Sequence, residues 1–215
     1  MNSAVARPRV AFQGEHGAFS EDAAFKLLGP DIELVPRRTF TELFRSLDEG
    51  VANYILAPVE NSLIGTIHSS VQLLQETSLA ISGDVVIPIQ QNLIGCRGAL
   101  FEEIEAVESH PAALAQCERF FVANPGISKI ESEDTAGSVA RIVTLGDRKR
   151  AAIAGRRAAD LYGGSILKED VQDRPDNYTR FLLLQAGAGA WAEANSGQTE
   201  AGSWFRESAF QGPVD

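Results

Sequence analysis

The sequence contains little of what disulfide-linked, metal-binding or membrane proteins are built from. Its 215 residues include two cysteines, one methionine and three histidines, and no apolar run approaches the roughly 20 residues of a membrane span. Cys96 and Cys117 are too few for a disulfide framework, and we interpret them as buried reduced thiols. The histidines show no metal-ligand spacing with one another or with the cysteines, so no metal site is predicted.

Positive charge is also scarce. There are 19 Lys and Arg against 29 Asp and Glu, a net charge of −10, and the pI is about 4.8. This balance argues against nucleic-acid partners, which require a basic face. An anionic ligand would need a local site made of a few Arg side chains and backbone N–H groups. The N-terminal "MNSAVARPRVAF" lacks the apolar region and cleavage site of a secretory signal, which predicts a cytoplasmic protein.

Short β-rich runs alternate with helical patterns along much of the chain. This alternation is typical of parallel βαβ units in an α/β fold. Residues 79–96 break it with two extended runs and no helix, as expected where a chain crosses between lobes. The predicted strands are 9–14, 32–36, 54–60, 104–109, 127–132, 151–155, 165–170 and 179–186. The predicted helices are 20–29, 40–50, 66–77, 111–121, 135–146 and 156–163.

These elements predict one two-lobed α/β domain over residues 1–187. We assign residues 1–86 to the first lobe and 87–165 to the second, and expect the last strands, 166–187, to return to the first. Residues 188–215 are rich in Ala, Gly and Ser and show no clear helix or strand period. We predict a disordered tail there, or a segment that docks through its aromatic side chains.

Four predicted helices begin with polar residues directly after a strand. In open α/β sheets these loops share one edge, where the N–H groups of helix N-termini hold carboxylates well. Each loop alone could be an ordinary helix cap, but four of them, joined by Thr179 and Arg180, predict a small-anion site. The loop residues are Ser20, Asn61, Ser62, Ser109, Thr135, Gly137 and Ser138.

Other patterns are weaker. "GEHGAF" is rich in glycine but is neither a GxGxxG fingerprint nor a P-loop, so nucleotide binding is not predicted. His110 is a candidate base, and a role as a helix cap or in packing is at least as well supported by its position before Pro111.

Six segments together resemble a known family. "GEHGAFSEDAA", "APVENSLIGTI", "ESHPAALAQC", "DTAGSVA", "AAIAGRRAADLYG" and "DNYTRFLLL" occur in the order found in prephenate dehydratases, over about residues 9–185. The resemblance implies a two-lobed fold like the type II periplasmic-binding architecture, with the active site in the interlobe cleft. It implies a hydro-lyase that removes carbon dioxide and water from prephenate to give phenylpyruvate in phenylalanine biosynthesis, with no metal or organic cofactor.

The resemblance also implies roles for particular residues. Thr179 would be catalytic and assist the departing hydroxyl, Arg180 would bind a carboxylate through its planar fork, and Phe181 would form an apolar wall. Ala18 and Phe19 would shape the floor of the cleft. Donors along the cleft would come from Asn61, Ser62, Ser109, Thr135, Gly137 and Ser138.

Two alternatives stay open. The substrate could be arogenate, the amino counterpart of prephenate, or the protein could be a two-lobed binder of a small carboxylate without chemistry. Bacterial relatives mostly continue into an ACT domain that binds phenylalanine, and its pattern is absent from this sequence, so we expect no feedback inhibition through that domain. We expect a dicarboxylate substrate, a homodimer, and no nucleic-acid or membrane partner.

Overall fold

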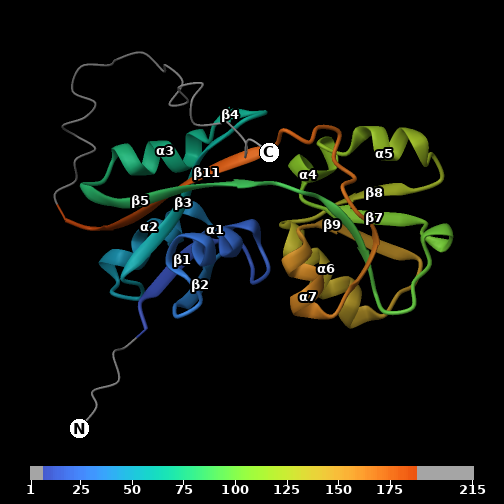
Figure 1. Ribbon diagram of the computed structural model, residues 1–215, viewed down its shortest axis with the longest axis horizontal. Coiled ribbons are helices and arrows are strands. Elements are labelled where there is room, and N and C mark those ends of the chain that lie inside the picture. The colour runs from blue at the N-terminus through green and yellow to red at the C-terminus, as the bar shows by residue number, and fades with distance from the viewer. Residues whose placement is uncertain (1–6, 188–215) are drawn as a thin grey trace, which may run out of the picture.

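A computed structural model describes residues 7–187 and shows two α/β lobes side by side (Figure 1). The tail predicted over residues 188–215 lies outside the described residues. The elements of the first lobe are β1 (Arg9–Gln13), α1 (Phe19–Leu28), β2 (Glu33–Arg37), α2 (Phe40–Asp48), β3 (Tyr54–Asn61), β4 (Gly65–Thr66), α3 (His68–Gln75), β5 (Leu79–Pro88) and β11 (Tyr178–Ala186). Its sheet has the order β2-β1-β3-β11-β5, with β4 paired to β3.

The second lobe contains the chain between β5 and β11. Its elements are β6 (Asn92–Gly95), η1 (Phe101–Glu103), β7 (Ala106–Ser109), α4 (Pro111–Ala115), α5 (Glu118–Ala123), β8 (Ser128–Glu131), α6 (Thr135–Leu145), β9 (Arg150–Ala154), α7 (Arg156–Tyr162) and β10 (Ser165–Lys168). Its sheet has the order β10-β6-β9-β7-β8.

The two sheets follow one plan. In each, three parallel strands are followed by an antiparallel strand that has just crossed from the other lobe: β11 beside β3 in the first lobe and β6 beside β9 in the second. This plan confirms the two-lobed α/β architecture, like the type II periplasmic-binding fold, that the sequence predicts.

The apolar run in β11 is explained by burial on both faces of the first sheet. Leu182 and Leu184 pack into the core beneath α2 and α3, whereas Phe181 and Leu183 pack into the core beneath α1. A strand covered on both faces reads as a continuous hydrophobic run because neither face meets water. β11 is therefore fixed in the middle of its sheet, between β3 and β5.

The chain crosses between the lobes twice, and the two crossings are hydrogen-bonded to each other. The N–H of Val171 donates to the carbonyl of Gln91 at 2.8 Å, and the N–H of Ile89 donates to the carbonyl of Asn177 at 2.8 Å. Figure 1 shows β5 leading into the second lobe beside the segment that returns to β11. The junction is thus a paired connection rather than two independent linkers.

Two details differ from the sequence-based prediction. Residues 166–168 belong to the second lobe, because β10 pairs with β6 and its Ile166 and Leu167 pack on the core of that lobe. The single helix predicted over 111–121 is two helices, α4 and α5. The side chain of Asp173, from the returning crossing, accepts from the N–H groups of Glu118 and Arg119 at 3.0 and 2.8 Å and so caps the second of them.

We predict that Leu184→Ala lowers the free energy of unfolding by about 2–5 kcal/mol, because the side chain is fully buried in β11 and its removal leaves a cavity. Urea denaturation followed by circular dichroism measures the change. Leu145→Ala is the matched control, since Leu145 is 63% exposed and its truncation should change stability by no more than about 0.5 kcal/mol. Equal effects of the two substitutions would contradict this account of β11.

Candidate active site

A cavity of about 260 Å³ lies between the lobes. Its walls come from the loop after β1, the start of α1, the ends of β3 and β11, the hinge after β5, and the starts of α4 and α6. The larger apolar residues of the lining are Phe19, Pro58, Ile64, Ile67, Ile89 and Phe181. The polar lining includes Asn61, Gln91, His110, Gln116, Thr135 and Thr179.

Thr179 is held at the wall of this cavity by Asn61. The Asn61 Nδ2 group donates to Thr179 Oγ1 at 3.0 Å, and the Asn61 Oδ1 atom accepts from the N–H groups of Leu63 and Ile64. Because the threonine oxygen is the acceptor in this bond, its own proton is left to be donated elsewhere. Thr179 is 7% exposed and lines the cavity, so a ligand is the natural recipient of that proton.

A buried amide network supports Asn61 from behind. Asn61 Nδ2 also donates to Asn177 Oδ1 at 2.7 Å, and Asn177 Nδ2 donates to Gln116 Oε1 at 3.1 Å. Asn177 is 1% exposed. Since Asn61 lies in the first lobe and Gln116 in the second, the network joins the two sides of the cavity through the residue two positions before Thr179.

Two helix N-termini face the cavity with unpaired N–H groups. Ala18 caps α1 without a side-chain hydrogen bond, and the N–H groups of Phe19 and Ser20 have no acceptor within residues 7–187. At α6, Asp134 accepts from Gly137 N at 2.5 Å. The Thr135 N–H, one residue after this cap, has no acceptor in the described part of the chain. These ends provide partial positive charge where an anion could bind.

Full positive charges are missing from the lining. None of the described residues that line the cavity is a Lys or Arg, whereas Glu133 and Asp134 lie on its rim. The exposed Arg38 of the first lobe pairs with Glu133 of the second at 3.0 Å, so the positive charge beside this acidic pair already has a partner between the lobes. His110 Nδ1 accepts from Ala112 N at 3.2 Å, so a neutral His110 carries its proton on Nε2.

Arg180 does not reach the cavity. Its guanidinium binds Asp84 on the neighbouring strand, with Nε and Nη2 at 3.0 and 2.9 Å from Asp84 Oδ2. Successive side chains of a strand point to opposite faces of the sheet, so the turn of Thr179 toward the cavity directs Arg180 away from it. The structure therefore separates these two predicted site residues and gives Arg180 an ion-pairing role within the sheet.

The remaining predicted residues divide into two groups. Ala18, Phe19, Asn61, Thr135, Thr179 and Phe181 line the cavity. The other four hydrogen-bond within the fold: Ser62 Oγ donates to Asp176 O, Ser109 Oγ to Ile153 O and Ser138 Oγ to Asp134 O, and Gly137 N is bound by Asp134. These four shape the loops around the cavity rather than its surface.

The sequence-based prediction missed Gln91 and Gln116 and the three isoleucines of the lining. Gln116 lies within the quoted segment "ESHPAALAQC", on the same side of its helical turn as Ala112 and Ala113, which also line the cavity. Helical spacing from Ala112 would therefore have found it. No pattern singles out Gln91, because its burial depends on how the two crossings pair.

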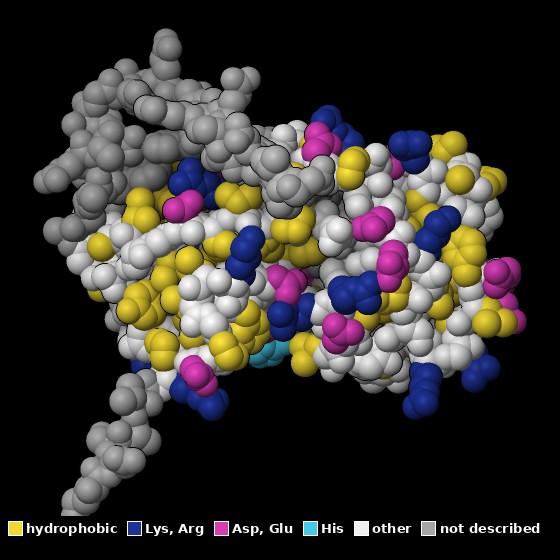
Figure 2. Space-filling model, viewed as in Figure 1, with side chains coloured by type: hydrophobic (Ala, Val, Ile, Leu, Met, Phe, Trp, Pro, Cys, Tyr) yellow, Lys and Arg dark blue, Asp and Glu magenta, His cyan; other side chains and the backbone are white. Residues whose placement is uncertain are grey.

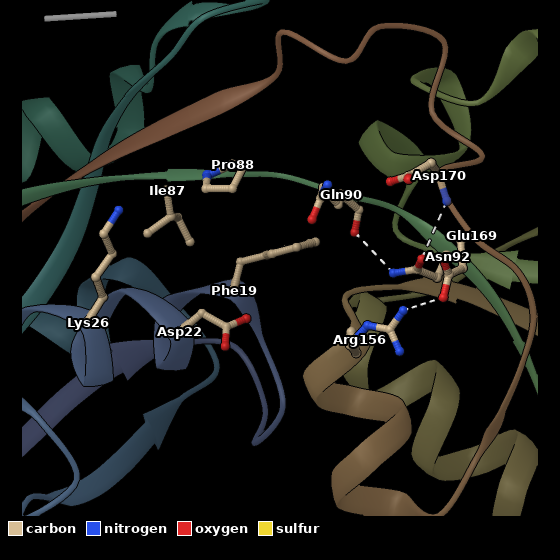
Figure 3. Close-up of a pocket in the computed structure, with 10 residues that line it drawn as sticks. All are labelled: Phe19, Asp22, Lys26, Ile87, Pro88, Gln90, Asn92, Arg156, Glu169 and Asp170. Carbon is tan, nitrogen blue, oxygen red and sulfur yellow. Dashed lines mark hydrogen bonds and ion pairs between the residues drawn. The ribbon is translucent and has the colours of Figure 1, made fainter. Parts of the chain in front are cut away.

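A second cavity, of about 360 Å³, lies where α1 faces β5 and the start of α7 (Figure 3). Its charged side chains already have partners: Arg156 pairs with Glu169, and Lys26 Nζ donates to the carbonyl of Val86 at 3.0 Å. Phe19 lines both cavities. Figure 2 shows acidic and basic side chains next to each other at this junction of the lobes. We therefore place the ligand in the first cavity.

Residues 7–187 contain neither a metal-binding cluster nor a membrane-spanning helix. No group of three or more His, Cys, Asp or Glu in this range could hold a metal ion. No helix in it is long and apolar enough to cross a membrane.

Comparison with known proteins identifies the family. A family model described as prephenate dehydratase matches residues 10–188. The chain belongs to the prephenate dehydratase family. The family resemblance seen in the six sequence segments is thereby confirmed, and the interlobe cavity lies where that resemblance places the active site.

Members of the family from plants and bacteria are similar over the same region. Arogenate dehydratase/prephenate dehydratase 2, chloroplastic, of Arabidopsis thaliana is 39% identical over 83% of this chain and 46% of its own length. The bifunctional chorismate mutase/prephenate dehydratase of Neisseria gonorrhoeae is 36% identical over 84% of this chain and 51% of its own length. The chain thus spans about half the length of these curated relatives.

A solved family structure has the same fold. The prephenate dehydratase of Arthrobacter aurescens, in complex with L-Phe, superposes with a TM-score of 0.75 at 27% identity. The match covers 84% of this chain and 61% of that one.

Behind the cavity wall, the carboxyl group of Glu60 is buried with few hydrogen-bond partners. It pairs with Arg180 in the β3–β11 register, is 5% exposed, and its Oε2 atom has no hydrogen-bond partner within residues 7–187. Burial raises the pKa of Glu60 above its usual 4.5, and the charge of Arg180 partly offsets this. Since the folded-state pKa is the higher one, protonated Glu60 favours folding and its ionisation opposes it.

We predict that Glu60→Gln makes the protein less sensitive to rising pH. Protonated Glu60 contributes fully to the free energy of unfolding when the pH is below the pKa of Glu60 in the unfolded state. This contribution is lost as the pH rises through the pKa of Glu60 in the folded state. Relative to wild type, the variant should therefore gain thermal stability over the pH range that begins near 4.5, the usual pKa of this carboxyl group, and extends upward. Thermal denaturation across this range measures the difference, with the exposed Glu102→Gln as control. A variant that loses stability relative to wild type as pH rises would contradict the assignment.

Proposed function

We propose that the protein catalyses the decarboxylating dehydration of prephenate, or of its amino counterpart arogenate. Prephenate and one proton give phenylpyruvate, carbon dioxide and water. The bond from the ring to its carboxylate breaks, its electron pair completes the aromatic ring, and the ring hydroxyl leaves on the opposite side as water. The chemistry is that of a hydro-lyase and requires a proton at the departing oxygen.

The position of Thr179 carries this proposal. Its hydroxyl lines an interlobe cavity, and it accepts a hydrogen bond from Asn61 at 3.0 Å, which leaves its own proton free. A donor fixed in this way can bind the departing hydroxyl as the carbon–oxygen bond breaks. Because Thr179 is nearly buried, water competes weakly for the same proton, and the hydrogen bond is stronger than it would be in water.

The rest of the cavity suits the two carboxylates of the substrate differently. The free N–H groups at the starts of α1 and α6 are suited to the carboxylate that is retained. The apolar wall of Ile64, Ile67 and Phe181 is suited to the carboxylate that leaves, because losing charge is easier where an anion is poorly solvated. Arg180 lies outside the cavity lining, since Asp84 holds its guanidinium, so this proposal gives it no contact with the substrate.

A cytoplasmic location and a homodimer stay predictions from the sequence.

We predict that Thr179→Val lowers kcat for product formation by about 100- to 10,000-fold, because it removes the proton donor and keeps the side-chain shape. Phenylpyruvate formed from prephenate is measured by its absorbance in alkali, and phenylalanine formed from arogenate by amino-acid analysis. Thr179→Ser should keep most of the activity, since serine supplies the same hydroxyl.

The matched control is Thr144→Val on α6, where the hydroxyl donates to the carbonyl of Ala140 on an exposed face. It should leave kcat unchanged. Full activity of Thr179→Val would overturn the role of Thr179. Binding of prephenate by the wild type without any product would instead favour a binding protein over a hydro-lyase.

A further inference from the structure

Gln91 has a buried amide oxygen without a partner among the described residues, at the wall of the interlobe cavity. The residue is 3% exposed and lines the cavity, and its Oε1 atom has no hydrogen-bond partner within residues 7–187. A buried polar atom left without a partner costs free energy. A ligand that supplies the missing partner would recover that cost on binding.

The backbone of Gln91 is held on both sides, so its side chain is presented from a fixed point. Its N–H donates to Gln172 Oε1 at 2.8 Å, and its carbonyl accepts from Val171 N at 2.8 Å. Because the unpartnered atom is the oxygen, a ligand group that donates a hydrogen bond is the one that would satisfy it.

Gln91 lies further along the wall of the cavity than Thr179. Thr179 lies opposite Ile87 in the β11–β5 register, and Gln91 follows Ile87 by four residues, which spans about 13 Å in extended chain. Ile89, between them, also lines the cavity. Thr179 and Gln91 therefore lie at different positions along the same wall of the cavity.

The charge of the cavity favours one of the two substrates. Prephenate carries two negative charges and a keto oxygen, whereas arogenate has an ammonium group in place of the keto oxygen. The lining contains no Lys or Arg among the described residues and has Glu133 and Asp134 on its rim. An ammonium group donates to an amide oxygen and is attracted by these carboxylates, while a second net negative charge is repelled by them.

We infer that Gln91 is a specificity-determining residue that accepts a hydrogen bond from the α-ammonium group of the substrate, so that the enzyme prefers arogenate to prephenate. The inference rests on the proposed function and adds to it the choice of substrate. It assigns the two residues separate tasks, since Thr179 acts on the ring hydroxyl and Gln91 recognises the side chain.

The test compares kcat/KM for arogenate and for prephenate in the full-length wild type and in Gln91 variants. The wild type should favour arogenate by about tenfold or more. Gln91→Leu should lower kcat/KM for arogenate by about 10- to 100-fold and that for prephenate by less than about threefold. Gln91→Glu keeps an acceptor and adds a negative charge, so it should retain most activity on arogenate and lose at least about tenfold on prephenate.

Ser70→Ala is the matched control, because Ser70 Oγ is also buried without a partner in the described chain but lies on α3 outside the cavity lining. It should leave the substrate ratio unchanged, and thermal denaturation should show all variants folded. Equal losses on both substrates in Gln91→Leu, an unchanged ratio, or a wild type that prefers prephenate would overturn the inference and leave the proposed function standing. A wild type that forms neither product would show that the proposed function is wrong, and the inference would fall with it.

Discussion

The hydrogen bonds between the two crossings determine how the rest of the molecule is arranged. Because Ile89 bonds to Asn177 and Gln91 to Val171, the strand leaving the first lobe and the strand returning to it remain in register. This register places β11 between β3 and β5 and brings its first residues to the edge of the cavity. The cavity, the amide network and the caps of the second lobe all depend on that one junction. A change in it would move Thr179 and Gln91 together.

The alternation of side chains along β11 separates two kinds of chemistry. Thr179 faces the cavity and accepts a hydrogen bond from Asn61, whereas Arg180 faces the other side, where it binds Asp84 and lies beside Glu60 in the register of β3 and β11. A guanidinium and a buried carboxyl group therefore lie one residue behind the cavity wall. The Arg180–Asp84 pair links β11 to β5, and Glu60 makes the stability of the sheet depend on pH. The two faces of this one strand thus have different partners, and the cavity surface keeps an uncharged hydroxyl.

Much of this could be predicted from the sequence, and the failures have physical causes. The βαβ alternation and the helix-free break gave the lobes, since hydrophobic periodicity reports local burial well. Strand β10 was assigned to the wrong lobe, because its pairing with β6 joins residues about seventy positions apart. The period of two along a strand already implied that Thr179 and Arg180 face opposite ways. Applied to "TRF", that rule would have predicted Arg180 on the face of the sheet opposite to Thr179 and Phe181.

The burial of Gln91 could not be predicted from the hydrophobic periodicity of the sequence. Its segment reads as a polar interruption between two extended runs, and such a residue is ordinarily exposed. Its burial follows from the contact with Gln172 and Val171, which come from the far end of the domain. A site built from such long-range pairing is visible only once the fold is known.

The absence of Lys and Arg from the cavity lining, among the described residues, fits the reaction better than a cationic pocket would. A guanidinium on the departing carboxylate would stabilise the substrate more than the transition state, in which that charge is already dispersing, and so would raise the barrier. In the proposed function, neutral N–H groups at the starts of α1 and α6 bind the retained carboxylate without this penalty on the departing one. The same reasoning applies to the hydroxyl. Its departure needs a proton donor and no lasting positive charge, and a threonine positioned by Asn61 provides one. The acidic composition of the chain is then compatible with an anionic substrate. The cavity offers dipoles and a complementary shape, whereas a fixed cation would stabilise the substrate more than the transition state.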